Sequence, residues 1–141
     1  PGHIKVLKMV SCFDAGKVIN PLTYTCQSEG AMVQSLGTAL FEELKLKDGK
    51  VLNKSFVDYK IPTADDVPEL VVKYVEHPEP TGPYGARGVG EPLMVPGLKV
   101  PGAPAIANAV YQAIGVRFRR MPITPDDVLK ALREQQENEK G

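Results

Sequence analysis

A segment rich in glycine and proline constrains this chain more than any other feature. Residues 78–104 hold 13 of these residues in 27 positions, which is half of all the Gly and Pro in the chain. Such a segment should form little regular structure, and a long irregular segment inside a compact domain is usually either functional or disordered. The apolar residues Val89, Leu93, Met94 and Val95 argue against disorder. We therefore expect a packed functional loop over 78–104.

Periodicity predicts a mixture of strands and helices around this loop. We expect strands at 4–10, 55–61, 70–76 and 118–123, a hairpin turn at 47–50, and helices at 23–44, at 104–114 and after Thr124. The strands and helices do not alternate regularly, which favours an α+β fold. The predicted domain has a small mixed sheet, a long helix in its N-terminal half and two C-terminal helices.

Two glycines lie inside the long predicted helix. Gly30 and Gly37 each weaken a helix by about 1 kcal/mol relative to alanine. Close approach of another group to the helix backbone would explain them, and a ligand is one such group. Glu29, beside Gly30, is interpreted as a carboxylate that complements the dipole at the start of the helix.

Composition excludes several classes of function. Seventeen basic residues balance 17 acidic residues, so no overall field attracts nucleic acid or an anionic membrane. No apolar run is long enough to cross a bilayer. Cys12 and Cys26 lack metal-ligand spacing, so we expect no metal ligands and no iron–sulfur cluster within the chain. The expected location is the cytoplasm, and the missing initiator Met suggests a fragment, a processed chain or a truncated chain.

One carboxylate stands out within the glycine-rich segment. Glu91 has Gly88 and Gly90 before it and a proline after it, which disfavours the helical conformation at Glu91. Neighbouring apolar residues would desolvate the carboxylate and raise its pKa, as a general base requires. From this segment alone, an ordinary solvated surface glutamate is the commoner case. The third glycine of a dinucleotide fingerprint and the Gly-Lys-Ser/Thr of a P-loop are both missing.

Four ordered motifs resemble one enzyme family. They are Asp14-Ala-Gly-Lys-Val-Ile-Asn-Pro-Leu, Gln27-Ser-Glu-Gly-Ala-Met-Val-Gln-Ser-Leu-Gly, Gly82-Pro-Tyr-Gly-Ala-Arg-Gly-Val-Gly-Glu-Pro, and Pro104-Ala-Ile-Ala-Asn-Ala-Val-Tyr-Gln-Ala-Ile-Gly-Val-Arg with Pro122-Ile-Thr-Pro. Together they resemble the molybdenum hydroxylases of the xanthine dehydrogenase/aldehyde oxidase type. The resemblance covers nearly the whole chain and identifies residues 1–141 as the C-terminal part of the molybdopterin-binding subunit, with residues 78–104 as its active-site loop.

The resemblance implies roles for individual residues. Glu91 would be the general base that takes a proton from molybdenum-bound hydroxide. Gln27 and the backbone at Val89 and Gly90 would contact the molybdopterin, with Gln34 a weaker candidate. The amide groups agree with this role, because a buried pterin needs donors and acceptors at fixed positions.

The resemblance also implies partners and a reaction. The molybdenum–molybdopterin would be shared with the rest of the subunit, and iron–sulfur clusters and FAD would lie on partner domains or subunits. The substrate would be an N-heterocycle, with purines slightly favoured, or an aldehyde. Two other interpretations remain open: a non-catalytic assembly protein or remnant that keeps the fold without cofactor, and a stand-alone ligand-binding module.

Overall fold

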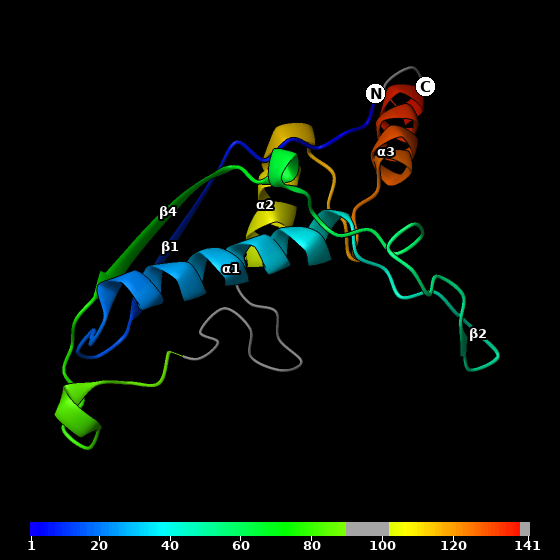
Figure 1. Ribbon diagram of the computed structural model, residues 1–141. Helices are drawn as coiled ribbons and strands as arrows, with labels where there is room; N and C mark the ends of the chain where they lie inside the picture. The colour runs from blue at the N-terminus through cyan, green and yellow to red at the C-terminus, as the bar shows by residue number, and fades with distance from the viewer. Residues whose placement is uncertain (90–101, 139–141) are drawn as a thin grey trace.

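The computed structural model describes residues 1–89 and 102–138. In chain order the elements are β1 (Lys8–Asp14), α1 (Pro21–Leu40), β2 (Leu46–Lys47), β3 (Lys50–Val51), η1 (Ala64–Asp66), β4 (Glu69–Val75), η2 (Pro83–Gly85), α2 (Gly102–Ile114) and α3 (Pro125–Asn138). Figure 1 shows α1 crossing the molecule, β1 and β4 side by side, and the β2–β3 hairpin extending away from the helices. The expected α+β fold, with one long helix and two C-terminal helices, is confirmed.

The two long strands form a parallel pair. β1 and β4 run in register from Lys8 opposite Glu69 to Asp14 opposite Val75. Side chains alternate along a strand, so one face of the pair carries Met9 and its neighbours toward the helices. On that face the rings of Tyr24 in α1 and Tyr74 in β4 meet edge to face, with centroids 5.3 Å apart. The helical layer therefore covers one face of this two-stranded sheet.

Helix α1 begins and ends for identifiable local reasons. The side chain of Asn20 accepts hydrogen bonds from the backbone N–H groups of Leu22 (3.0 Å) and Thr23 (3.2 Å), and Pro21 occupies the first turn. At the other end, the N–H groups of both Phe41 and Glu42 donate to the carbonyl of Gly37, each at 2.8 Å. The helix thus starts two residues before the predicted boundary and stops at Leu40 rather than at residue 44.

The C-terminal helices complete the core. α2 packs on α1 through buried Ile106 and Val110, and it ends at Gly115, whose positive φ of 73° suits glycine. α3 begins with a reciprocal cap, as predicted: Thr124 N donates to Asp127 Oδ2 (3.0 Å), and Asp127 N donates to Thr124 Oγ1 (3.2 Å). The buried core combines residues from β1, all three α-helices and the segment before α3.

Some predicted strands were wrong. Residues 55–61 contain a turn in which Tyr59 N donates to Ser55 O at 2.8 Å, and no strand forms there. Residues 118–123 are also irregular, because they pack on the end of α1 instead of joining a ladder; Ile123 is 2% exposed and its N–H donates to Ala39 O. The first strand lies four residues later than expected. The hairpin at 47–50 is confirmed, with positive φ at Asp48 and Gly49.

Candidate cofactor-binding site

The parallel pairing places the C-terminal ends of β1 and β4 at one edge of the sheet. The chain continues from there into residues 76–89 and returns to the end of β1. Ala86 forms an isolated bridge with Gly16, Arg87 N donates to Ala15 O (3.0 Å), and Lys17 N donates to Gly85 O (2.8 Å). We call residues 14–17 with 85–87 the clamp. It fixes the backbone two residues before Val89.

Charged side chains form ion pairs on the solvent-exposed side of the clamp. The guanidinium of Arg87 lies 3.6 Å from Asp14 Oδ2 and 3.4 Å from Glu79 Oε2. The other oxygen of Asp14 accepts the N–H of Gly16 at 2.9 Å. That hydrogen bond, helped by the charge of Arg87, holds the pKa of Asp14 below its ordinary value of 3.8. Thr81 lowers the pKa of Glu79 in the same way, through its hydroxyl and its N–H. Both carboxylates are therefore ionised structural groups near neutral pH.

Glycine is required where the two halves of the clamp meet. Gly16 has φ +62°, and a Cβ there would lie 2.5 Å from Gly85 O and 2.9 Å from Arg87 N. Both contacts are with backbone atoms, which cannot rotate away. Gly85 also has a positive φ, of 76°, as does the neighbouring Tyr84 at 54°. The Gly-Pro-Tyr-Gly-Ala-Arg motif thus has a structural explanation in its backbone.

The two glycines of α1 have different surroundings. A Cβ on Gly37 would clash with Glu42 and lie 3.1 Å from Pro62, so the chain itself packs closely there. A Cβ on Gly30 would meet no atom of residues 1–89 or 102–138 within 4 Å. The close approach that the sequence predicted is therefore internal at Gly37, whereas no described residue packs against the backbone at Gly30.

One face of α1 is polar and exposed. Gln27, Gly30 and Gln34 follow the three- and four-residue spacing of a single helix face, and all three are exposed. We call them the polar face of α1. Gln27 lies six residues after Pro21, or about 9 Å along the helix, and the helix itself begins four residues after the clamp. The amide of Gln27 offers both hydrogen-bond donors and acceptors, as pterin recognition requires.

The structure describes two of the four predicted site residues. Gln27 lies on the polar face of α1, and Val89 is half-buried just after the clamp. Gly90 and Glu91 lie outside the described residues. The interpretation of Glu29 was wrong, because α1 begins at Pro21 and Glu29 is more than two turns from the positive end of its dipole.

Sequence reasoning did not find the clamp. Asp14 and Arg87 are 73 positions apart, and no spacing rule links them. Asp14-Ala-Gly and Arg87 were each assigned to a family motif, but no contact between the two motifs was predicted. The one available signal was that both residues belong to motifs already singled out.

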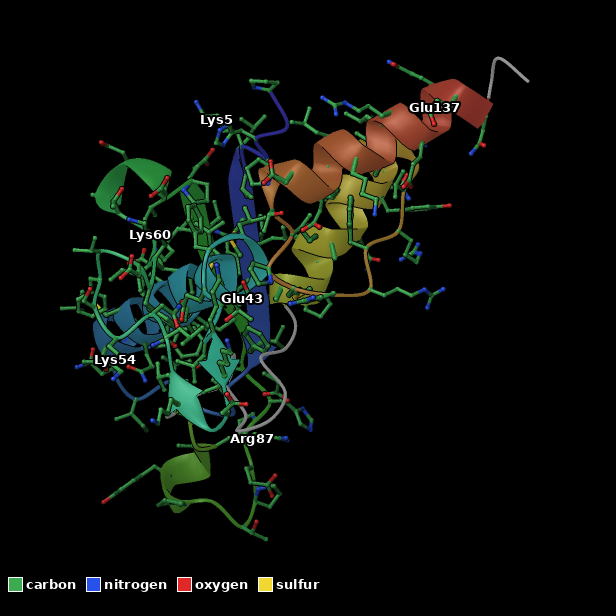
Figure 2. The ribbon with its side chains drawn as sticks, turned by 90° about the vertical axis from the view of Figure 1, so that its right-hand side faces the viewer. Lys5, Glu43, Lys54, Lys60, Arg87 and Glu137 are labelled. Atoms are coloured by element: carbon green, nitrogen blue, oxygen red, sulfur yellow. The ribbon has the colours of Figure 1, made fainter. Side chains whose placement is uncertain are left out.

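Helix α2 begins at Gly102, on the other side of residues 90–101. A Cβ on this glycine would clash with the side chain of Ser35 in α1. Val89 and Gly102 are thus the described residues on either side of 90–101. The clamp lies far from α3, since Figure 2 shows Arg87 at the opposite end of the molecule from Glu137.

Two further searches cover only the described part of the chain. No group of three or more His, Cys, Asp or Glu side chains within 1–89 and 102–138 could hold a metal ion. None of the helices described there is both long and apolar enough to cross a membrane.

Comparison with known proteins assigns the chain to a family. A family model described as "Molybdopterin cofactor-binding domain" matches residues 1–68. The chain is 39% identical, over 124 residues and 86% of its length, to the xanthine dehydrogenase molybdenum-binding subunit of Escherichia coli O157:H7. It belongs to the xanthine dehydrogenase/aldehyde oxidase family. It is also 39% identical, over 93% of its length, to the aldehyde oxidoreductase molybdenum-binding subunit of Escherichia coli K12.

Solved structures of the family show the same fold. Quinoline 2-oxidoreductase from Pseudomonas putida 86 matches 92% of the chain with a TM-score of 0.82 and 30% identity. Aldehyde oxidoreductase from Desulfovibrio gigas matches 94% with a TM-score of 0.80 and 35% identity. The chain covers only 16% and 14% of those two structures, and 16% and 18% of the two Escherichia coli subunits. It therefore spans about one sixth of the length of its relatives.

Proposed function

We propose that this chain is the C-terminal part of the molybdenum-cofactor-binding subunit of a hydroxylase, and that its 78–104 segment forms part of the active site. Membership of the family supports the class of enzyme. The observation that carries the proposed site is the clamp, in which two backbone hydrogen bonds form a bridge that ties residues 85–87 to residues 15–17. The clamp gives the Gly88-Val-Gly-Glu segment a fixed starting point.

The polar face of α1 fits a pterin cofactor. Gln27 can donate and accept hydrogen bonds, and the open position at Gly30 leaves room for a bulky group against the helix backbone. We assign Gln27 and the backbone of Val89 and Gly90 to cofactor binding. When bound, the molybdenum cofactor supplies the redox centre that takes two electrons from the substrate.

Glu91 is assigned the role of general base. A glutamate can accept a proton near neutral pH when apolar neighbours disfavour its charged form. Val89, Leu93 and Met94 provide such neighbours in the sequence. The clamp would act as a positioning element, because a base must lie within about 2.6–3.2 Å of the group it deprotonates.

The proposed substrate is an aldehyde or an electron-poor N-heterocycle such as a purine. Relatives of both kinds occur, since the similar proteins include a xanthine dehydrogenase, aldehyde oxidoreductases and a quinoline oxidoreductase. The proposed partners are the remaining part of the molybdenum-binding subunit, together with iron–sulfur and flavin domains or subunits that carry the electrons away. The proposed location is the cytoplasm.

Metal analysis of the native complex tests the proposal. We expect stoichiometric molybdenum and pterin in the complex that contains this chain, with co-purifying polypeptides that bear iron–sulfur clusters and FAD. The competing function is a non-catalytic assembly protein that keeps the fold. A complex with no molybdenum and no substrate-dependent electron transfer would favour that alternative.

A further inference from the structure

The strand β1 has a hydrogen-bonded partner on only one edge within the described part of the chain. Glu69 N donates to Leu7 O (3.3 Å) and Ala15 N donates to Val75 O (3.2 Å), at the two ends of the β1–β4 ladder. Residues alternate in direction along a parallel strand, so the odd-numbered residues bond to β4. The backbone groups of Lys8, Val10 and Cys12 therefore point to the opposite edge, which no described strand covers.

A long apolar groove follows this open edge. It has a volume of about 810 Å³, and one wall consists of eleven consecutive residues, 3–13. Residues 8–13 of this wall belong to β1, and six strand residues span about 20 Å, so the groove runs along the strand. The facing wall is α2, which contributes Gly102, Ala105, Ala109 and Ala113. These small side chains lie on one face of the helix and leave room for larger side chains between α2 and the edge.

Two buried hydroxyl groups line the same groove and lack partners. Ser11 of β1 is 6% exposed and Ser35 of α1 is 1% exposed, and neither Oγ has a hydrogen-bond partner among the described residues. Buried polar atoms are almost always hydrogen-bonded in native proteins. An incoming polypeptide would supply the missing partners.

Apolar side chains in and beside β1 also indicate an unfinished sheet. Leu7, directly before β1, is 74% exposed, and Val10 within β1 is 63% exposed. Parallel sheets are normally covered on both faces, and native proteins protect long apolar edges from unwanted pairing. We expect these residues to become buried in the assembled protein.

We propose that the groove between β1 and α2 receives an extended apolar segment from the remaining part of the molybdenum-binding subunit, which pairs as a strand with the open edge of β1. This inference rests on the proposed function, since it assigns the chain to a larger subunit. The relatives are about six times longer than the aligned region, so most of their polypeptide has no counterpart in this chain. Addition of a strand satisfies backbone groups and places alternate side chains in the groove.

A second copy of the chain fits the groove less well. Its β1 strand would bring its own α2 helix to the same edge, because α2 lines the groove in each copy. A single extended segment has no such attached helix.

Photo-cross-linking in the complete enzyme tests the proposal. The photoreactive amino acid benzoylphenylalanine would replace Ala109, which lines the groove, and as a matched control Gln112, an exposed residue of the same helix outside it. We expect Ala109→benzoylphenylalanine to cross-link to one segment outside residues 1–141, and the control to give no link to that segment. A link from position 109 to a second copy of residues 1–141, or no polypeptide link, would overturn the proposal.

Hydrogen exchange on the unmodified enzyme gives an independent test, because the bulky residue could disturb packing. With single-residue resolution, we expect the amides of Lys8, Val10 and Cys12 in the assembled enzyme to be protected to within about tenfold of those of Met9, Ser11 and Phe13, which bond to β4. Much faster exchange at Lys8, Val10 and Cys12 than at these neighbours would contradict strand addition. Neither readout depends on molybdenum, so failure here leaves the metal analysis intact, and absence of metal leaves these results interpretable.

Discussion

The first half of the clamp lies shortly before the polar face of α1 in the sequence, but the two regions differ in how their polar groups are paired. In the clamp, Arg87 pairs with Asp14, whose carboxylate also accepts a backbone N–H. Glu79, just outside the clamp, is the second partner of Arg87. On the polar face, Gly30 leaves an open position next to an exposed amide, Gln27. The contrast separates the family motifs by their physical role: charged groups that neutralise each other position the chain, whereas a backbone position that no described residue covers, beside an exposed amide, suits a ligand.

The largest effect should come from adding a side chain inside the clamp. Gly16→Ala places a Cβ against Gly85 O and Arg87 N. The control Gly49→Ala lies at a similar positive φ, but a Cβ there would have no atom of the described residues within 4 Å. Both variants carry backbone strain of about 1–3 kcal/mol, but only Gly16→Ala must push the clamp apart. We expect molybdenum content of the complete enzyme to fall at least tenfold in Gly16→Ala and to change little in Gly49→Ala. Equal losses would show that strain alone is responsible.

A smaller effect should follow from Gln27→Ala on the polar face. Loss of one partner of a buried polar group costs about 1–3 kcal/mol, so cofactor affinity should fall by roughly 5- to 150-fold. Turnover per molybdenum should stay near that of the wild type. Quantification of pterin and metal after dialysis provides the measurement, with Gln112→Ala of α2 as the control. Normal occupancy in Gln27→Ala would remove Gln27 from the site.

Gly30→Ala sharpens the comparison, because stability and binding should change in opposite directions. Alanine stabilises a helix interior by about 1 kcal/mol relative to glycine, and no atom in the described part of the chain obstructs the new Cβ. We expect the thermal midpoint of the isolated chain to rise slightly while the cofactor content of the enzyme falls. If both the midpoint and the cofactor content rise or stay level, no ligand lies against Gly30.

The smallest effect concerns pH. The folded chain holds the pKa of Asp14 below 3.8, so its carboxylate stabilises the fold above that pH, and this contribution disappears as the pH falls through the lowered pKa. We expect urea unfolding of the chain to separate wild type from Asp14→Asn at pH 6, with the difference shrinking below about pH 3.8. A difference that is unchanged at pH 2.5 would exclude the Asp14 charge as its source.

The sequence predicted local structure well where local chemistry decides it. Asn20-Pro21, Asp48-Gly49, Gly115 and the Thr124–Asp127 pair mark caps and turns through contacts within four residues. The strands predicted at 55–61 and 118–123 failed because strand formation needs a distant partner. Residues 118–123 instead pack on α1, with Ile123 bonded to Ala39.

The residues of the candidate site show the same difference between features that the sequence reveals and features that depend on distant contacts. Gly30 was found because it lies inside a helix predicted from periodicity, and Gln27 was found through the family resemblance. The clamp was not, since it depends on the parallel pairing of β1 with β4, which brings Asp14 near Arg87. The role of Glu91 came from the family resemblance and stays a prediction.

The most direct test of the central claim is the Glu91→Gln variant of the complete enzyme. The amide is nearly isosteric, so we expect molybdenum content and substrate binding to be retained, and Glu134→Gln on α3 provides a control at an exposed carboxylate. Because the amide cannot accept the proton, turnover should fall by about 10²- to 10⁴-fold. A Glu91→Gln enzyme that keeps its molybdenum and turns over within a few-fold of the wild-type rate would contradict the assignment of Glu91 as the base.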